Sequence, residues 1–88
     1  MQKFSPAQVG QRIRAIRGKV TQTDFAKILG VHKQNYISRY ERGRVPSPEL
    51  LIKIADYGKV SLDWLLTGKG KGLSDKQMRM VKKKARRR

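Results

Sequence analysis

The stretch of sequence that decides the fold runs from Thr21 to Gly43 and reads TQTDFAKILGVHKQNYISRYERG. Its pattern predicts two short helices joined by a tight turn. Thr21 is suited to begin the first helix, because its hydroxyl can accept a hydrogen bond from an unpaired amide of the first turn. Gly30 is suited to end it, because glycine readily adopts the left-handed backbone found after helices. The apolar stripe between these ends consists of Phe25, Ala26, Ile28 and Leu29.

The second helix is distinguished by an outer face of amides and cations. Ile37 and Tyr40 share the inner face, at a spacing of i, i+3. Ordinary solvated faces mix charges of both signs, whereas amides and cations suit base edges and the phosphates around them. The pattern therefore predicts a helix-turn-helix that reads DNA, with a recognition helix over about residues 33–42. Its outward residues are Lys33, Gln34, Asn35, Arg39 and Arg42.

Several short blocks follow one another in a set order over roughly residues 7–68. They are Thr21-Gln22, Phe25-Ala26, Leu29-Gly30-Val31, the run from Ile37 to Gly43, Pro46-Ser47, the run from Leu50 to Ala55, and the run from Val60 to Leu66. Together they resemble the Xre/Cro-type helix-turn-helix proteins of phages and bacteria. No block is specific alone, but their agreement in order is. The resemblance implies an all-α, five-helix, lambda-repressor-like DNA-binding domain.

The chain departs from the family pattern between Gly30 and Gly43, which are separated by one residue more than usual. Without a gap, Tyr36 would be buried and Arg39 would point into the core, where an unpaired cation is very costly. With the extra residue placed in the turn before Tyr36, Ile37 becomes the buried residue and Arg39 faces outward. We favour this second alignment. It leaves open, by one residue, which side chain leads into a DNA groove: Lys33, Gln34 or Asn35.

Three more helices are predicted by serine residues that can cap their first turns. Ser5 and Ser47 each precede a proline, which is favoured at the first helical position, and Ser61 begins a shorter segment. The expected ends of these helices are Gly18, Gly58 and Gly68. Their inward residues are Val9, Ile13, Ile16, Leu50, Leu51, Ile54 and Ala55, and the core is finished by Leu62, Trp64, Leu65 and Leu66. No segment shows the alternation of a β-strand.

Composition narrows the classes of function. The chain has 88 residues, no cysteine and one histidine, so we expect one small domain with an appendage, no disulfide, no metal site and no cofactor. No apolar run approaches the roughly 20 residues that span a bilayer. The N-terminus lacks the apolar stretch of a secretion signal. We therefore expect a soluble, cytoplasmic protein associated with the nucleoid.

Net charge is the second strong signal, at +16 for the whole chain. Residues 1–68, the predicted domain, carry 12 Lys and Arg against 5 Asp and Glu, and residues 69–88 carry 10 against 1. Such a balance indicates a polyanionic partner. Membrane binding is disfavoured, because the segment 69–88 has no aromatic residue to anchor it.

The segment 69–88 is predicted to be a basic linker and tail. Gly68 to Gly72 has the composition of a flexible linker. Ser74 repeats the capping pattern, so residues 74–84 are a candidate basic sixth helix. The remainder is either a solvated end or an arm that contacts DNA or RNA.

The resemblance also implies roles for individual residues. Gln22 would contact a phosphate and brace the start of the recognition helix, unless it is only an exposed polar residue. Tyr36 would pack on the sugar-phosphate backbone or a thymine methyl, or be a partly buried core residue. Arg17 and Glu41 would form a structural ion pair. Candidates for base edges are Lys33, Gln34 and Asn35, candidates for a base or phosphate are Ser38 and Arg39, and candidates for phosphates are Arg42 and Arg44, with Lys53, Arg12 and Arg14 weaker.

These observations favour a transcriptional regulator, and more specifically a repressor, that binds a short palindromic operator in double-stranded DNA as a homodimer. The apolar surface left on the fifth helix is the candidate dimer contact. The alternative is an antitoxin-like or accessory nucleic-acid-binding module, whose basic tail contacts RNA, nonspecific DNA or an acidic partner. We expect no enzyme, because the sequence lacks a nucleophile-base pair, a carboxylate dyad and a phosphate-binding glycine loop.

Overall fold

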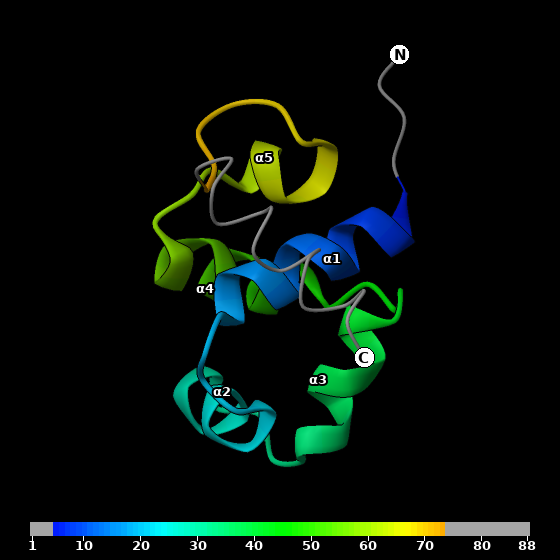
Figure 1. Cartoon of the computed structure of the whole chain (residues 1–88), viewed down its shortest axis with the longest axis vertical. Helices are drawn as coiled ribbons and strands as arrows, with labels where there is room; N and C mark the ends of the chain where they lie inside the picture. Colours follow the sequence, from blue (N-terminus) through cyan, green and yellow to red (C-terminus); the bar gives the residue numbers. More distant parts are fainter. Residues whose placement is uncertain (1–4, 74–88) are drawn as a thin grey trace.

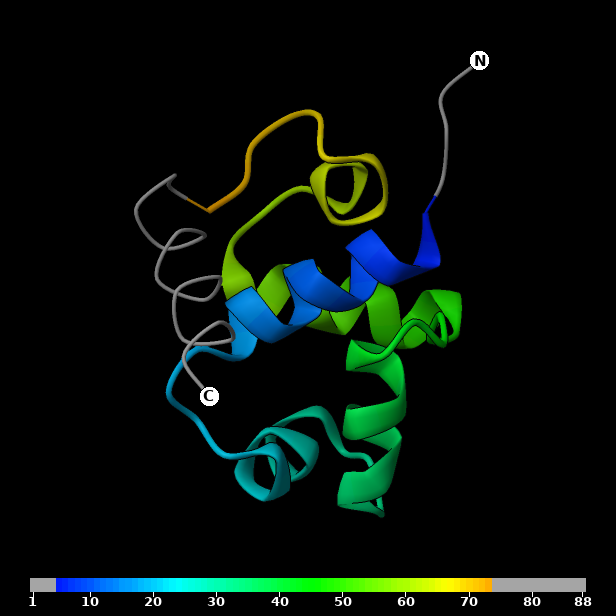
Figure 2. The same cartoon turned by 45° about the vertical axis from the view of Figure 1, so that its right-hand side comes forward.

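The computed structural model describes residues 5–73, and within this range the fold consists of helices alone. Five helices follow one another: α1 (Pro6–Arg17), α2 (Gln22–Leu29), α3 (Gln34–Glu41), α4 (Pro48–Gly58) and α5 (Leu62–Thr67). Figure 1 shows α1 crossing the middle of the molecule, with α5 on one side and α2 and α3 on the other. Figure 2 shows the same arrangement from a second direction. The predicted all-α fold is confirmed.

Side-chain caps begin four of these helices, at the residues that the sequence indicated. Thr21 Oγ1 accepts a hydrogen bond from the backbone N–H three residues on, at 3.1 Å. The hydroxyls of Ser5, Ser47 and Ser61 do the same at 3.0 to 3.3 Å. Helix α3 differs, because its N-cap is Lys33 and no side chain caps it. Helix α3 therefore begins without the local stabilisation that its neighbours have.

One core joins all five helices, with α1 at its centre in contact with α3, α4 and α5. Each helix contributes at least one side chain with almost no solvent exposure. These side chains are Val9 and Ile13 of α1, Phe25 of α2, Ile37 of α3, Ile54 of α4 and Leu65 of α5. None of the described helices is long and apolar enough to cross a membrane.

Helices α1 and α3 meet backbone to backbone at Gly10. A Cβ atom built on Gly10 would lie 2.6 Å from the carbonyl oxygen of Glu41 and 2.7 Å from that of Tyr40. No side chain fits in that space, so glycine is required for α1 to pack against the last turn of α3. This contact sets the position of α3 relative to the core.

Residues 68–73 form a strap that packs over α5, although their composition predicted a flexible linker. The Ser61 backbone N–H donates to the Lys71 carbonyl oxygen at 2.8 Å. Gly72 lies directly against the Trp64 indole. Leu73 packs against the core. Gly68 and Gly70 have left-handed φ angles of 86° and 96°, and Gly72 passes too close to Trp64 for a side chain. Glycine at these positions is thus explained by the fold of the strap.

Three further details differ from the sequence prediction. Ile28 is 52% exposed and Leu62 is 38% exposed, because their helices face the core with other residues. The left-handed residue after α4 is Lys59, with φ of 57°, and not Gly58. Gly58 is the last helical residue of α4, and glycine fits there because a Cβ atom would lie 2.9 Å from Ile16 Cγ2. The predicted sixth helix at residues 74–84 lies outside the described residues.

Candidate nucleic-acid interface

The turn between α2 and α3 has the geometry of a helix-turn-helix. Gly30 follows α2 with a left-handed φ of 77°, and the Val31 N–H donates to the Ala26 carbonyl oxygen at 2.8 Å. In α3, Ile37 is fully buried, whereas Tyr36 is 39% exposed and Arg39 is exposed. The alignment with an extra residue in the turn is therefore the right one.

The bounds of α3 decide how its candidate residues are placed. Gln34 is the first helical residue and Glu41 is the last, so Lys33 and Arg42 at the ends of the predicted range are the caps. These bounds narrow the choice of the residue that would lead into a DNA groove. Lys33 precedes the helix, and Gln34 and Asn35 form its first turn. The Gln34 side chain lies outside what the structure describes.

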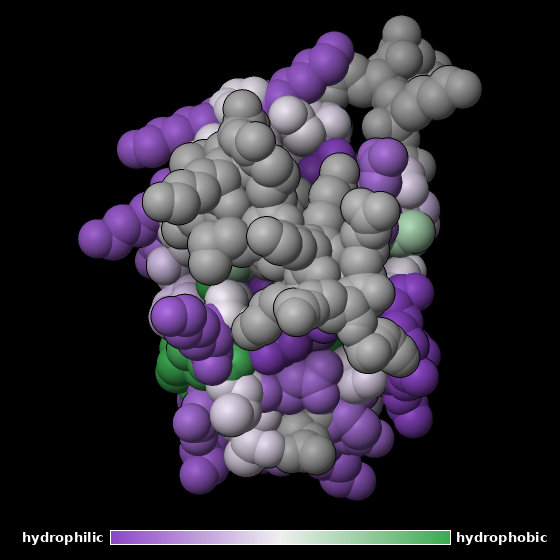
Figure 3. Space-filling view, viewed as in Figure 1, coloured by the Kyte–Doolittle hydropathy of each residue, from purple (hydrophilic) through white to green (hydrophobic). Residues whose placement is uncertain are grey.

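The outer face of α3 and the loop after it are exposed and rich in cations. Ser38 is half-buried, as is Tyr40, which packs against the core. Figure 3 shows hydrophilic residues over this side of the molecule, at the lower right. The exposed candidates are Lys33, Asn35, Tyr36, Arg39, Arg42 and Arg44. A surface of this kind attracts a polyanion and presents several hydrogen-bond donors to it.

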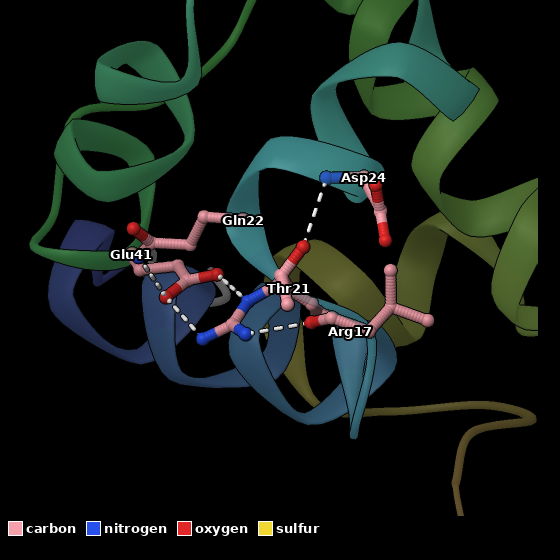
Figure 4. Close-up of polar contacts among 6 residues, drawn as sticks. Arg17, Thr21, Gln22, Asp24 and Glu41 are labelled. Carbon is pink, nitrogen blue, oxygen red and sulfur yellow. Dashed lines mark hydrogen bonds and ion pairs between the residues drawn. The ribbon is translucent and has the colours of Figure 1, made fainter.

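The negative charge of Glu41 is offset by Arg17, within a network that joins three helices (Figure 4). Arg17 of α1 donates to both carboxylate oxygens, with Nε–Oε2 at 2.6 Å and Nη2–Oε1 at 3.1 Å. The Arg17 Nη1 group also donates to the Val20 carbonyl oxygen at 2.8 Å. The Glu41 side chain is only 7% exposed. The ion pair implied by the resemblance is thus present, and the only acid of α3 does not oppose an anionic ligand.

Gln22 belongs to the same network, through a contact that the resemblance did not imply. Its Nε2 group donates to Glu41 Oε1 at 3.2 Å. Gln22 therefore braces the last residue of α3. Figure 4 shows its side chain beside the Glu41 carboxylate. A primary amide has two N–H donors, so one remains for a phosphate at the N-terminus of α2.

Arg12 makes hydrogen bonds within the domain. Its Nη1 group donates to the Leu65 carbonyl oxygen near the end of α5, at 3.3 Å, and its Nη2 group donates to Gln8 Oε1 at 3.5 Å. Partial burial lowers the pKa of the Arg12 guanidinium from its ordinary value. Arg12 thus stabilises the α5 end of the domain. Arg14, by contrast, is exposed.

Lys53 lies on α4, beside the end of α2. It lines a shallow, open pocket of about 400 Å³ between the end of α2 and one face of α4. Its ammonium group lies close to Gly30, at the C-terminus of α2. Cations are favourable at helix C-termini, so a structural role accounts for this position.

Comparison with known proteins agrees with this geometry. A family model described as helix-turn-helix matches residues 11–65, which cover the motif and most of the domain. The chain belongs to the Xre-like helix-turn-helix family. The domain of this family is a DNA-binding regulatory domain. No curated protein and no solved structure matches the chain.

Two contacts at or near the exposed face of α3 were not predicted from the sequence. The Gln22–Glu41 hydrogen bond joins residues 19 positions apart on different helices, and no local pattern announces it. The second contact places the Arg39 Cζ atom over the Tyr36 ring, 5.9 Å from its centroid. The spacing of i, i+3 between a tyrosine and an arginine on one helix face was the available signal for it.

Proposed function

We propose that this chain is a transcriptional regulator, acting as a repressor, that reads a short palindromic operator in double-stranded DNA. The observation that carries the proposal is the division of α3 into two faces. Ile37 is buried beneath it, while Asn35, Tyr36 and Arg39 are exposed above it. A helix anchored on one side and polar on the other can enter the major groove as a rigid unit.

The proposed docking follows from the positions of the helices. Helix α3 lies in the major groove, with its first turn nearest the base edges, and α2 crosses the backbone. Gln22 at the start of α2 then faces a phosphate. Arg42 and Arg44 follow α3 and are exposed, which suits contacts to phosphates on the groove wall. Base contacts supply the sequence preference and these backbone contacts supply affinity.

A homodimer on DNA is part of the proposal. Two copies of α3 related by a two-fold axis would read half-sites one helical turn apart. Support for a dimer contact at α5 comes from Leu62, an apolar side chain that is 38% exposed at the start of that helix. Because a two-fold interface is self-complementary, the recovered operator should itself be palindromic.

A second candidate function is an accessory or antitoxin-like module that binds nucleic acid through its basic C-terminal segment. The observation that favours it is charge, because residues 69–88 carry 10 Lys and Arg against 1 acid. Binding driven by such a segment would be indifferent to base sequence and would weaken steeply with salt.

The two candidate functions are distinguished by selecting bound duplexes from a random pool. The selected duplex is then titrated at several salt concentrations. A regulator should bind its selected duplex about 10³-fold or more tightly than random DNA. The same titration is carried out with a variant truncated after Leu73, which keeps the strap on α5. We expect this truncation to weaken all duplexes alike and to lower the salt dependence. Loss of sequence preference on truncation would instead favour the accessory module.

A further inference from the structure

Tyr36 and Arg39 form a pair on the outer face of α3. The Arg39 Cζ atom lies over the Tyr36 ring at 5.9 Å from the centroid, within the range of a cation–π attraction. Both residues are exposed, and neither is part of the hydrophobic core. The contact is therefore not a by-product of core packing, and it lies where the proposed function places DNA.

The contact determines where the guanidinium points. Side chains on a helix lean toward its N-terminus, so Arg39 reaches back over the first turn of α3 to meet Tyr36. This turn is the part of the helix nearest the bases in the proposed docking. The Arg39 guanidinium forms no hydrogen bond or ion pair with the described side chains. A ring face accepts no conventional hydrogen bond, so among the described residues the N–H groups of Arg39 keep no partner.

We propose that Tyr36 is a positioning residue, which holds Arg39 ready to read one guanine in each half-site. The inference rests on the proposed function. Guanine follows from the chemistry of the side chain, because the planar fork of arginine matches the O6 and N7 acceptors of guanine in the major groove. A free arginine would have to be ordered on binding, whereas one held on a ring is ordered beforehand.

The guanine contact is tested on the duplex that the wild-type chain selects from a random pool. Each guanine is replaced in turn by 7-deazaguanine, which lacks the N7 acceptor. The wild-type chain should lose at least about fivefold in affinity at one guanine per half-site, as expected for part of a bidentate contact. The Arg39→Ala variant should show no loss at that guanine. If no guanine depends on Arg39, as for an arginine that contacts only a phosphate, the inference is wrong.

The role of Tyr36 is tested with two matched variants. Tyr36→Phe keeps the ring and should bind as the wild type does. Tyr36→Leu keeps apolar bulk without a ring, and should lose about two- to fivefold in affinity, which is the scale of an exposed cation–π contact. In the Arg39→Ala background the two should bind alike. Equal losses for Phe and Leu, or a Leu loss that persists without Arg39, would contradict a role through Arg39.

The design separates this inference from the proposed function. If no duplex is enriched from the random pool, the proposed function itself fails. If a palindromic duplex is enriched but its guanines do not depend on Arg39 and Tyr36, only the present inference fails. Circular dichroism melts of each variant should match the wild type, because both positions are exposed.

Discussion

Glu41 shows how a single residue can join separate helices beneath a binding face. Its carboxylate accepts from Arg17 and from Gln22, and its backbone carbonyl oxygen faces Gly10. One residue thus links α1, α2 and α3. The ion pair also offsets the negative charge of Glu41 next to the exposed cations of α3 and its caps.

Replacing Glu41 should cost stability. Glu41→Ala leaves the Arg17 guanidinium, whose side chain is 15% exposed, without its carboxylate. We expect a loss of about 2–3 kcal/mol in the free energy of unfolding, measured by chemical denaturation. Asp56→Ala is the matched control, because Asp56 is exposed and should change stability by less than about 0.5 kcal/mol. If Glu41→Ala lowered the free energy of unfolding as little as Asp56→Ala is expected to, the network would not contribute to stability.

Gly10→Ala tests the backbone contact between α1 and α3. Helix propensity alone would make this substitution stabilising by about 1 kcal/mol. The added Cβ, however, would lie 2.6 Å from a backbone carbonyl oxygen, which no rotamer change relieves. We therefore expect a net loss of about 2 kcal/mol or more on thermal unfolding. Gln11→Ala, at an exposed position of the same helix, should be neutral or stabilising.

Gln34→Ala tests the leading residue of the reading helix. We expect it to change the base preference at one position of each half-site, at a cost of about 1–3 kcal/mol in binding. Arg44→Ala should instead weaken binding evenly across sequences, as loss of a phosphate contact does. Competition among single-base variants of the selected duplex measures both. A Gln34→Ala loss of equal size on cognate and scrambled DNA would remove Gln34 from the set of base readers.

At the scale of the element, α3 differs from its neighbours in lacking a side-chain cap. Lys33 has an extended backbone (φ −125°, ψ 133°) that a capping serine could adopt. Lys33→Ser should therefore stabilise the domain by about 1 kcal/mol. It should also weaken DNA binding, because it removes a cation from the proposed interface. The slope of log K against log salt concentration should fall in magnitude by about one. Unchanged binding with higher stability would exclude Lys33 from the interface.

The helices were predictable because their signals are local. A capping hydroxyl, an apolar stripe and a terminal glycine all lie within one element, as at Thr21, Phe25 and Gly30. The same signals placed Ile37 inward and Arg39 outward. Contacts between elements have no such signal. The exposure of Ile28 depends on where neighbouring helices lie, which the period of α2 does not contain.

The strap is the clearest case of a pattern with two meanings. Alternating glycine and lysine from Gly68 to Gly72 is typical of an unattached linker. The structure shows that side chains at the three glycines would meet Arg12, Ser61 and Trp64 respectively. These partners lie in α1, in the turn before α5 and in α5. Only the assembled fold distinguishes a glycine chosen for flexibility from one chosen for close approach.

At the scale of the whole molecule, the strap and α3 lie on opposite sides of α1. The strap follows α5, whereas α3 lies on the other side of α1 (Figure 1). Disturbing the strap should therefore lower stability without altering base preference. This separation allows the folding role of residues 68–73 to be measured apart from DNA binding.

Gly72→Ala tests the closure of the domain by the strap. A Cβ at this position would run into the Trp64 indole, so the strap must lift and expose a ring that is now 8% exposed. We expect a loss of about 2 kcal/mol in stability and a red shift in the emission of the chain's only tryptophan. Lys71→Ala is the control, because the exposed Lys71 contributes only its backbone carbonyl to the contact with Ser61. If the two variants emit and unfold alike, the strap does not close the core. If Gly72→Ala also changed base preference, the strap and α3 would be coupled through α1, contrary to their separation in the fold.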